Sequence, residues 1–209
     1  MSRPLIISDC DEVLLHMVAP YAAWLGETQG ITFKLDTPSF VDAMRRTDTG
    51  EPVEKAEIWR LLNQFFETEM HRQYPIAGAV EAMGKLSQRA EVVVLTNIGD
   101  AHQANRMRQL AGHGLDFRVF TNVGPKGPAL QQIIAEYRPS RAVFIDDIAQ
   151  HHGSVAELAP EVLRLHFCGD PHVASKIPCA HAAGHAHARI DDWASAASWL
   201  LERLEGEGA

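Results

Sequence analysis

Cysteine and long hydrophobic runs are both scarce in this sequence of 209 residues. The three cysteines, Cys10, Cys168 and Cys179, cannot form a disulfide framework, so folding has to depend on a buried core. No apolar run approaches the roughly 20 residues that span a bilayer. The N-terminal segment reaches an acid, Asp9, too early for a signal peptide. These absences predict a cytoplasmic protein with no membrane partner.

Basic residues are also few, with 19 Lys and Arg against 27 Asp and Glu and a net charge of −8. This balance argues against a nucleic-acid partner, because such proteins rely on cationic contacts with phosphates. Small anionic substrates stay compatible with it, since a bound cation reverses the local sign of charge. Apolar residues make up 46% of the chain, which is ordinary for a globular protein and argues against disorder.

Short apolar runs alternate with helix-like segments along most of the chain. The runs are rich in Val, Ile, Leu and Phe, as buried parallel strands tend to be, and cover residues 4–8, 91–95, 117–120, 142–145 and 162–167. Helices are predicted over residues 76–88, 100–111, 127–137, 154–158 and 191–204. This alternation predicts an α/β fold with a doubly wound parallel sheet, whose active site lies at the carboxyl ends of the strands.

Residues 14–74 interrupt the alternation. This segment has no good strand, and its helical stretches include one apolar face that runs from Ile58 to Met70. Thr37 followed by Pro38 resembles the start of another helix. We therefore predict a core of residues 1–13 and 75–209 with a small helical subdomain, residues 14–74, inserted after the first strand.

Polar residues gather where the predicted strands end. Two acids follow the first strand, a Thr-Asn pair ends the second, a lysine opens the helix after the third, and an acidic pair ends the fourth; they are Asp9, Asp11, Thr96, Asn97, Lys126, Asp146 and Asp147. Four carboxylates in one cleft repel each other unless a hard cation neutralises them. Mg²⁺ prefers oxygen ligands and usually binds a few carboxylates together with substrate phosphate. One carboxylate can then attack phosphorus while its neighbour handles protons.

At these residues the sequence resembles the phosphatase branch of the haloacid dehalogenase superfamily. The family pattern is matched by Asp9-Cys10-Asp11-Glu12-Val13, Thr96, Lys126 and Asp146-Asp147, in the family's order and spacing. The insertion sits where that family places its first type of cap. The resemblance implies a hydrolase that acts on a small phosphorylated metabolite through an aspartyl-phosphate, as a monomer or homodimer.

The resemblance also implies residue roles. Asp9 is the expected nucleophile, and Asp11 the expected acid and base. Thr96 and Lys126, with backbone N–H groups near Asn97, are expected to bind the phosphoryl group. Magnesium is expected on the Asp9 carboxylate, the Asp11 backbone carbonyl, Asp146 and Asp147. One departure concerns the outer shell of the metal. Many members carry a further acid about four residues after the acidic pair, where this chain has Gln150, His151 and His152, so Gln150, a histidine or no residue takes the place of that acid.

Several other residues are candidates for binding the substrate or a metal ion. Arg45 and Arg46 lie in a polar stretch of the insertion and are candidate substrate-binding residues, although a solvated connection is the simpler interpretation. His151 and His152 follow the acidic pair, where a surface position at a helix start is the simpler interpretation. The segment 181–187 carries three histidines, without the pattern of a structural zinc site.

Three alternatives to a phosphatase remain open. A phosphotransferase or mutase of the same fold would pass the phosphoryl group to a second substrate. A receiver-like phospho-acceptor module would share the acidic pair, Thr and Lys, but such modules are shorter and lack the insertion. A fold member that has lost catalysis would act as a binding protein.

Overall fold

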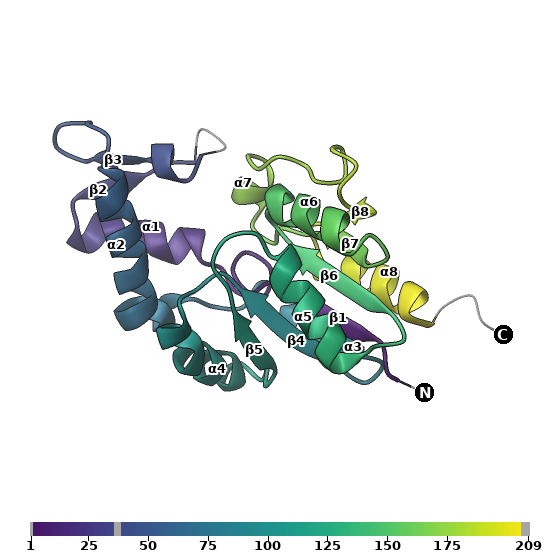
Figure 1. The fold of residues 1–209 in the computed structure, drawn as a ribbon. Helices are drawn as coiled ribbons and strands as arrows, with labels where there is room; N and C mark the ends of the chain where they lie inside the picture. Colours follow the sequence, from purple (N-terminus) through teal and green to yellow (C-terminus); the bar gives the residue numbers. More distant parts are fainter. Residues whose placement is uncertain (1, 36–38, 206–209) are drawn as a thin grey trace.

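The computed structural model describes residues 2–35 and 39–205. Its centre is a six-stranded sheet in the order β5-β4-β1-β6-β7-β8, in which every neighbouring pair is parallel (Figure 1). The strands are β1 (Leu5–Ser8), β4 (Glu91–Thr96), β5 (Arg118–Thr121), β6 (Ala142–Asp146), β7 (Leu163–His166) and β8 (Ala188–Arg189). The five predicted strands are therefore present, and the two-residue β8 was too short to be recognised in the sequence.

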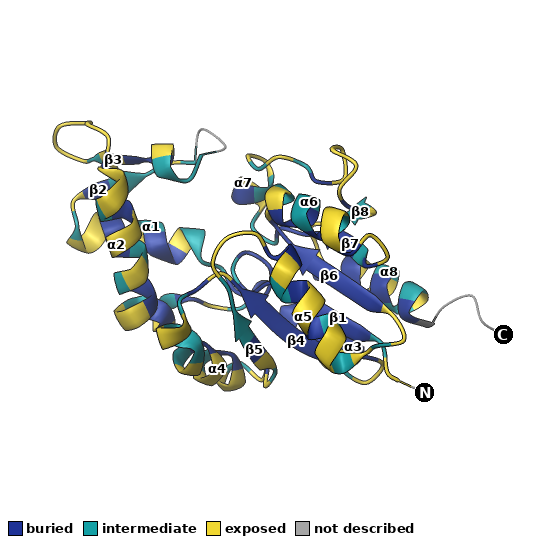
Figure 2. Cartoon of the chain, viewed as in Figure 1, coloured by how far each residue is buried: buried dark blue, intermediate teal, exposed yellow. Residues whose placement is uncertain are grey.

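Helices cover both faces of this sheet, which confirms the predicted doubly wound α/β fold. They are α3 (Ala79–Leu86), α4 (Gln103–Gly112), α5 (Gly127–Tyr137), α6 (Ala149–Leu158), α7 (Pro171–Ala174) and α8 (Trp193–Glu205), with a 3-10 turn, η4 (Asp100–His102), before α4. One apolar cluster joins Ile6 of β1 to α3 and α8, and another joins Leu5 and Ile7 to α5 and α6. The alternate side chains of β1 thus face opposite layers, as the pleat requires. Figure 2 shows the central strands as the most deeply buried part of the molecule.

Helix α6 begins at Ala149, whereas the sequence predicts a start near Ser154. The glycine at 153 discourages a helix in a sequence-based reading. In the structure Gly153 lies in the interior of α6. A Cβ at this position would lie 3.3 Å from Nδ1 of the His185 ring, so the absence of a side chain lets the two segments pack closely. No helix of the described residues is long and apolar enough to cross a membrane.

The segment of residues 14–74, called the insertion below, lies beside the sheet (purple to blue in Figure 1). It contains α1 (Val18–Thr28), β2 (Ile31–Phe33), η1 (Val41–Ala43), β3 (Met44–Arg46), α2 (Lys55–Gln64), the π-helical turn η2 (Phe65–Glu69) and η3 (Met70–Arg72). Strands β2 and β3 form an antiparallel pair. The expectation that this segment has no strand is therefore wrong, because three-residue strands are too short to show an alternating pattern. The predicted helix start at Thr37 and Pro38 lies outside the described residues.

The insertion packs around an apolar cluster of its own. Tyr21 and Trp24 of α1 meet Phe65 of η2 in this cluster, and Ile98 of the core reaches into it. The two chain segments that connect the insertion to the core are paired, since His16 N–H donates to Tyr74 O at 2.9 Å and Ile76 N–H donates to Leu14 O at 2.9 Å. The insertion therefore enters and leaves the core at one place.

Candidate functional site

Three carboxylates meet where β1 and β6 end. The backbone N–H of Asp9 donates to Ile145 O at 2.8 Å, so the chain after β1 stays beside the end of β6. Ligand oxygens of Asp9, Asp146 and Asp147 all lie within 4.8 Å of one another, and the three side chains are buried. This juxtaposition follows from the parallel register, because parallel strands end at the same edge of a sheet.

Lys126 binds two of these carboxylates from the start of α5. Its Nζ lies 2.8 Å from Asp9 Oδ1 and 2.6 Å from Asp146 Oδ2, and the side chain is 0% exposed. Burial by itself lowers the pKa of Lys126, but Asp146 and Asp9 outweigh it and the pKa is raised. Lys126 is therefore a permanent cation within the acidic cluster.

A close helix contact fixes the position of this lysine. The next residue, Gly127, donates its N–H to Ser154 Oγ at 3.1 Å. A Cβ at Gly127 would come within 2.5 Å of that oxygen and 2.6 Å of the Ser154 backbone carbonyl oxygen. Glycine at this position lets the start of α5 lie against α6, and the preceding lysine then reaches under the strand ends.

One ammonium group does not balance three buried carboxylates. Burial raises the pKa of Asp9 to about 7 against the opposing effect of Lys126. Burial also raises the pKa of Asp147 well above its ordinary value, with further increases from Asp146 and Asp9. The pKa of Asp146 is lowered, because Lys126 overcomes the effect of burial there. A set of oxygen donors with surplus negative charge fits Mg²⁺, whose preferred ligands are carboxylates.

Thr96 and Asn97 stand at the end of β4, next to the carboxylates. The Thr96 hydroxyl is buried and has no hydrogen-bond partner within the described part of the chain. Asn97 Nδ2 donates to Gly124 O at 2.9 Å in the loop before Lys126. An unpartnered buried hydroxyl costs free energy, and a bound oxyanion would satisfy it.

Asp11 turns toward a different set of partners. Arg106 Nη2 of α4 donates to both Asp11 oxygens, at 2.9 and 3.0 Å, and Gln73 Nε2 donates to Oδ1 at 2.7 Å. Arg106 is 0% exposed, lies 3.1 Å from Cys10 Sγ, and stacks over the Phe66 ring at 5.5 Å. A planar guanidinium bound through two hydrogen bonds fixes both the position and the orientation of a carboxylate.

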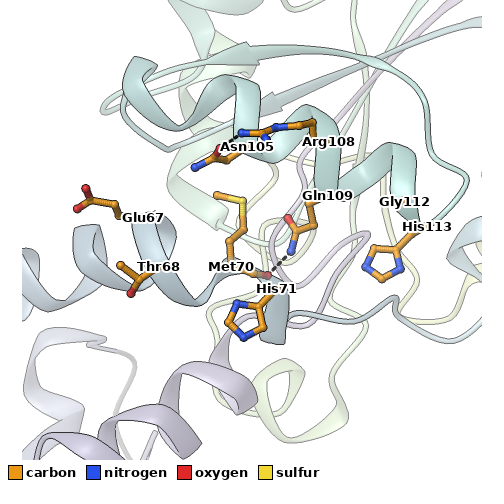
Figure 3. A pocket seen from close by; sticks show the side chains of 9 residues that line it. All are labelled: Glu67, Thr68, Met70, His71, Asn105, Arg108, Gln109, Gly112 and His113. Atoms are coloured by element: carbon orange, nitrogen blue, oxygen red, sulfur yellow. Dashed lines mark hydrogen bonds between the residues drawn. The ribbon is translucent and has the colours of Figure 1, made fainter.

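Sequence reasoning missed Arg106, and no local signal distinguishes it from the exposed Arg108 two positions later. The same network continues to the insertion, since Arg106 Nη1 donates to Gln109 Oε1 at 3.0 Å and Gln109 Nε2 donates to Met70 O. Figure 3 shows Gln109 reaching from α4 to Met70. Helix α4 thus connects Asp11 to the end of the insertion.

A cavity of about 470 Å³, called the central cavity below, opens between the strand ends and the insertion. The core contributes residues of the carboxylate site, α6 and the α7 region, and the insertion contributes side chains from α1 to η2. The lining residues are Asp9, Asp11, Glu12, Met17, Val18, Leu35, Phe40, Trp59, Leu62, Phe66, Asn97, Asp147, Ile148, Ala149, Gln150, His151, Val173, Ile177 and Pro178. A space of this size suits a small organic ligand.

A second cavity of about 440 Å³ lies between the end of the insertion and α4 (Figure 3). Its lining includes Glu67, His71, Arg108 and His113, but none of the strand-end residues. Of the predicted strand-end residues, Asp9, Asp11, Asn97 and Asp147 line the central cavity instead.

Arg45 and Arg46 are not among the residues that line the central cavity. Arg46 forms an ion pair with Glu57 of α2, and Arg45 is exposed on β3. The geometry thus gives no contact between either arginine and the carboxylate site.

The histidines also differ from expectation. His151 and His152 are buried rather than on the surface, because α6 begins earlier than predicted. His152 Nε2 donates to Asp146 O at 2.9 Å, and His151 Nε2 lies 3.3 Å from Asn97 Nδ2. In segment 181–187, His181 Nδ1 meets Ala186 O and His187 Nδ1 accepts from Arg164 N–H. Among the described residues, this segment contributes to no group with metal-binding geometry.

A second group with metal-compatible spacing is formed by Glu12, His16 and Asp170. Both of its acids already serve as helix caps. Glu12 Oε1 accepts from Met17 N–H and Val18 N–H at the start of α1, and Asp170 Oδ1 accepts from two N–H groups of α7. These bonds give one oxygen of each acid a local structural role, whereas Glu12 Oε2 and His16 Nδ1 are buried without a hydrogen-bond partner among the described residues.

Comparison with solved structures decides the fold. A haloacid dehalogenase family hydrolase from Deinococcus radiodurans R1, solved with bound phosphate and sodium, aligns with a TM-score of 0.66 at 17% identity over 96% of each chain. The chain has the haloacid dehalogenase-like fold. A predicted phosphoglycolate phosphatase from Haemophilus somnus 129Pt aligns with a TM-score of 0.66 at 13% identity, over 94% of this chain and 97% of that one. A haloacid dehalogenase-like family hydrolase from Streptococcus pneumoniae gives 0.64 at 11% identity, over 95% and 98%. No family model and no curated protein matches the sequence.

Proposed function

We propose that this chain is a divalent-metal-dependent phosphomonoesterase that acts on a small phosphorylated metabolite. The observation that carries the proposal is the position of Asp9, in contact with Lys126 and beside Asp146 and Asp147 at the cavity wall. A carboxylate at this position can act as the nucleophile, because a lysine and further carboxylate oxygens surround it. The fold shared with hydrolases that include a phosphate-bound structure supports the same reaction class.

The residues divide the reaction between them. An Asp9 oxygen attacks phosphorus and forms an acyl phosphate, while the bond from phosphorus to the ester oxygen breaks. Asp11, protonated for this step, gives its proton to the leaving alkoxide. Asp11 then takes a proton from water as that water attacks phosphorus, which releases inorganic phosphate and restores the Asp9 carboxylate.

The other residues bind the phosphoryl group. The Thr96 hydroxyl and backbone N–H groups near Asn97 donate to its oxygens, and Lys126 offsets the charge that Asp9 shares with it. Asp9, Asp146 and Asp147, with the backbone carbonyl of Asp11, would hold Mg²⁺. When bound, the metal supplies positive charge to the phosphoryl oxygens.

The test is a phosphate-release assay with p-nitrophenyl phosphate and a panel of alkyl phosphates, with magnesium and with chelator. We expect release with magnesium, loss of release in chelator, and recovery when magnesium is restored. The Asp9→Asn variant should lose at least about a thousandfold in kcat, because an amide is a poor nucleophile. Asp116→Asn, at an exposed position outside the cavity, is the matched control and should retain full activity.

Circular dichroism and thermal melting establish that Asp9→Asn is folded. Wild-type turnover by a folded Asn variant would exclude Asp9 as the nucleophile. Full activity in chelator would exclude the metal. Loss of the phosphate ester without release of free phosphate, in the presence of a second alcohol, would identify a phosphotransferase instead.

A further inference from the structure

The insertion contributes an apolar wall to the central cavity. Its lining residues come from the region of α1 to η2 and carry no charge: Met17, Val18, Leu35, Phe40, Trp59, Leu62 and Phe66. The charged residues of the cavity all belong to the core side. A ligand whose phosphoryl group reaches the carboxylate site therefore places the rest of its structure against the apolar wall.

Two large apolar side chains are exposed at this cavity. Trp59 of α2 is 45% exposed, and Ile148, directly after the acidic pair, is 42% exposed. The Trp59 ring also stacks on Phe40, with ring centroids 6.5 Å apart and an interplanar angle of 20°. Exposed apolar side chains that gather at a cavity mark a binding surface, and stacked aromatic rings offer a flat one.

Among the described residues that line the central cavity there is no Lys or Arg, so the cavity wall itself provides no free cation for a second anionic group. His151 is the single basic residue among the described lining residues, and burial lowers its pKa, which keeps it neutral. Lys126 and Arg106 are fully buried and already bound to Asp9, Asp146 and Asp11. The undescribed residues, Met1, 36–38 and 206–209, include no Lys, Arg or His.

A substrate with a carboxylate or a second phosphate would be penalised here. Its extra charge would lose water without gaining a cationic partner, and it would face the carboxylates of the core wall. An aromatic or bulky apolar group would instead bury its surface against Trp59, Leu62 and Phe66.

We infer that the substrate is the phosphate monoester of an uncharged alcohol that carries an aromatic or bulky apolar group. This inference rests on the proposed phosphomonoesterase function and specifies its substrate class. The phosphoryl group occupies the carboxylate site, and the apolar group lies between Trp59 and Ile148.

The test compares two alkyl esters whose leaving groups are both primary alcohols. One is 2-phenylethyl phosphate, and the other is the phosphate monoester of 3-hydroxypropionate, in which a carboxylate replaces the ring. With magnesium present, kcat/KM should be at least about tenfold higher for the phenylethyl ester, the lower limit of discrimination by a hydrophobic pocket. Methyl phosphate, which has no group to reach the apolar wall, provides the reference rate.

The Trp59→Ala variant tests whether Trp59 is responsible for the preference for 2-phenylethyl phosphate. It should lower kcat/KM for 2-phenylethyl phosphate at least about fivefold and leave methyl phosphate unchanged, because Trp59 contacts only the apolar group. Arg60→Ala is the matched control on the same helix, since its exposed side chain lies outside the cavity. It should leave both rates unchanged.

Each outcome separates this inference from the function on which it rests. If phosphate is released but the carboxylate ester is equal or preferred, the substrate class is wrong and the phosphomonoesterase stands. The same holds if Trp59→Ala leaves the phenylethyl rate intact. If neither ester, nor methyl phosphate, nor p-nitrophenyl phosphate releases phosphate with magnesium, the proposed function fails and the substrate class fails with it.

Discussion

The core wall and the insertion wall of the central cavity hold their side chains in different ways. On the core wall, Asp9 and Asp11 each have a buried cationic partner, Lys126 and Arg106 respectively, and Lys126 also binds Asp146. On the insertion wall, Trp59 stacks on Phe40. Charged groups in a low-dielectric setting require defined partners, whereas apolar groups require only contact.

This difference predicts how each wall responds to substitution. Removing a partner on the core wall leaves a buried charge without compensation, so stability and chemistry change together. Trp59, the exposed residue of the insertion wall, is not part of the apolar cluster of Tyr21, Phe65 and their neighbours, so its replacement should leave folding intact. The molecule thus separates a constrained reaction centre from an adjustable binding surface.

The largest expected effect follows from Lys126→Met. The substitution leaves Asp9 and Asp146 buried without their common cation and should lower the free energy of unfolding by about 3–5 kcal/mol. Magnesium should restore part of this loss by binding the freed carboxylates. Thermal melting with and without magnesium measures both effects.

Lys85→Met is the control for this prediction, because Lys85 forms a salt bridge with Glu81 on the exposed surface. It should change stability by less than about 1 kcal/mol, and magnesium should stabilise it to the same extent as the wild-type protein. A similar small change in Lys126→Met would mean that the core wall does not depend on its cation, and the contrast between the two walls would lose its basis.

An intermediate effect is expected for Arg106→Met, which removes the guanidinium that orients Asp11. For an alkyl phosphate, kcat/KM should fall about 10–100-fold, because departure of the alcohol needs a positioned proton donor. For p-nitrophenyl phosphate the loss in kcat/KM should be much smaller, since p-nitrophenolate leaves without protonation. The ratio of kcat/KM between the two substrates is the measurement, because kcat also contains the later hydrolysis step that both substrates share.

Two further variants make this ratio decisive. Arg108→Met, at an exposed position on the same helix, should leave both values unchanged. Arg106→Lys keeps the charge without the two-point contact and should recover only part of the alkyl rate. Equal losses of activity for both substrates in Arg106→Met would mean that Arg106 only stabilises the structure and does not position Asp11 for proton transfer.

The smallest effect is expected for Arg46→Ala. Arg46 is held by Glu57 rather than by the cavity, so KM should stay within about twofold of the wild-type value. Its partly exposed ion pair contributes less than about 1 kcal/mol to stability. A KM raised more than about tenfold, measured by initial rates, would mean that the Arg46 cation takes part in substrate binding. That result would contradict the apolar character of the insertion wall.

The sequence predicted the parts of the site that depend on strand ends. Asp9, Thr96 and Asp146 each end a recognisable apolar run, and parallel pairing then brings these residues to one edge. The position of Lys126 at the start of its helix was predictable for the same reason. These features are local, so a single sequence contains them.

Features that depend on packing between distant segments were not predictable. Arg106 lies on a polar helix, and only the docking of α4 against β5 and against η3 of the insertion buries it beside Asp11. The burial of His152 depends on where α6 begins, which Gly153 obscured. The strand pair β2 and β3 is stabilised by its antiparallel pairing between separate segments rather than by any pattern within three residues.

The paired connections of the insertion have a consequence for how this architecture can change over time. Because Leu14–Ile76 and His16–Tyr74 hydrogen bonds keep the two crossing points side by side, the segment between them resembles a long loop with its ends already closed. A replacement of different length would cost little additional closure entropy, since that cost grows only logarithmically with length. Exchange of the insertion as one unit would therefore retain the sheet and its reaction centre and replace the apolar wall of the cavity.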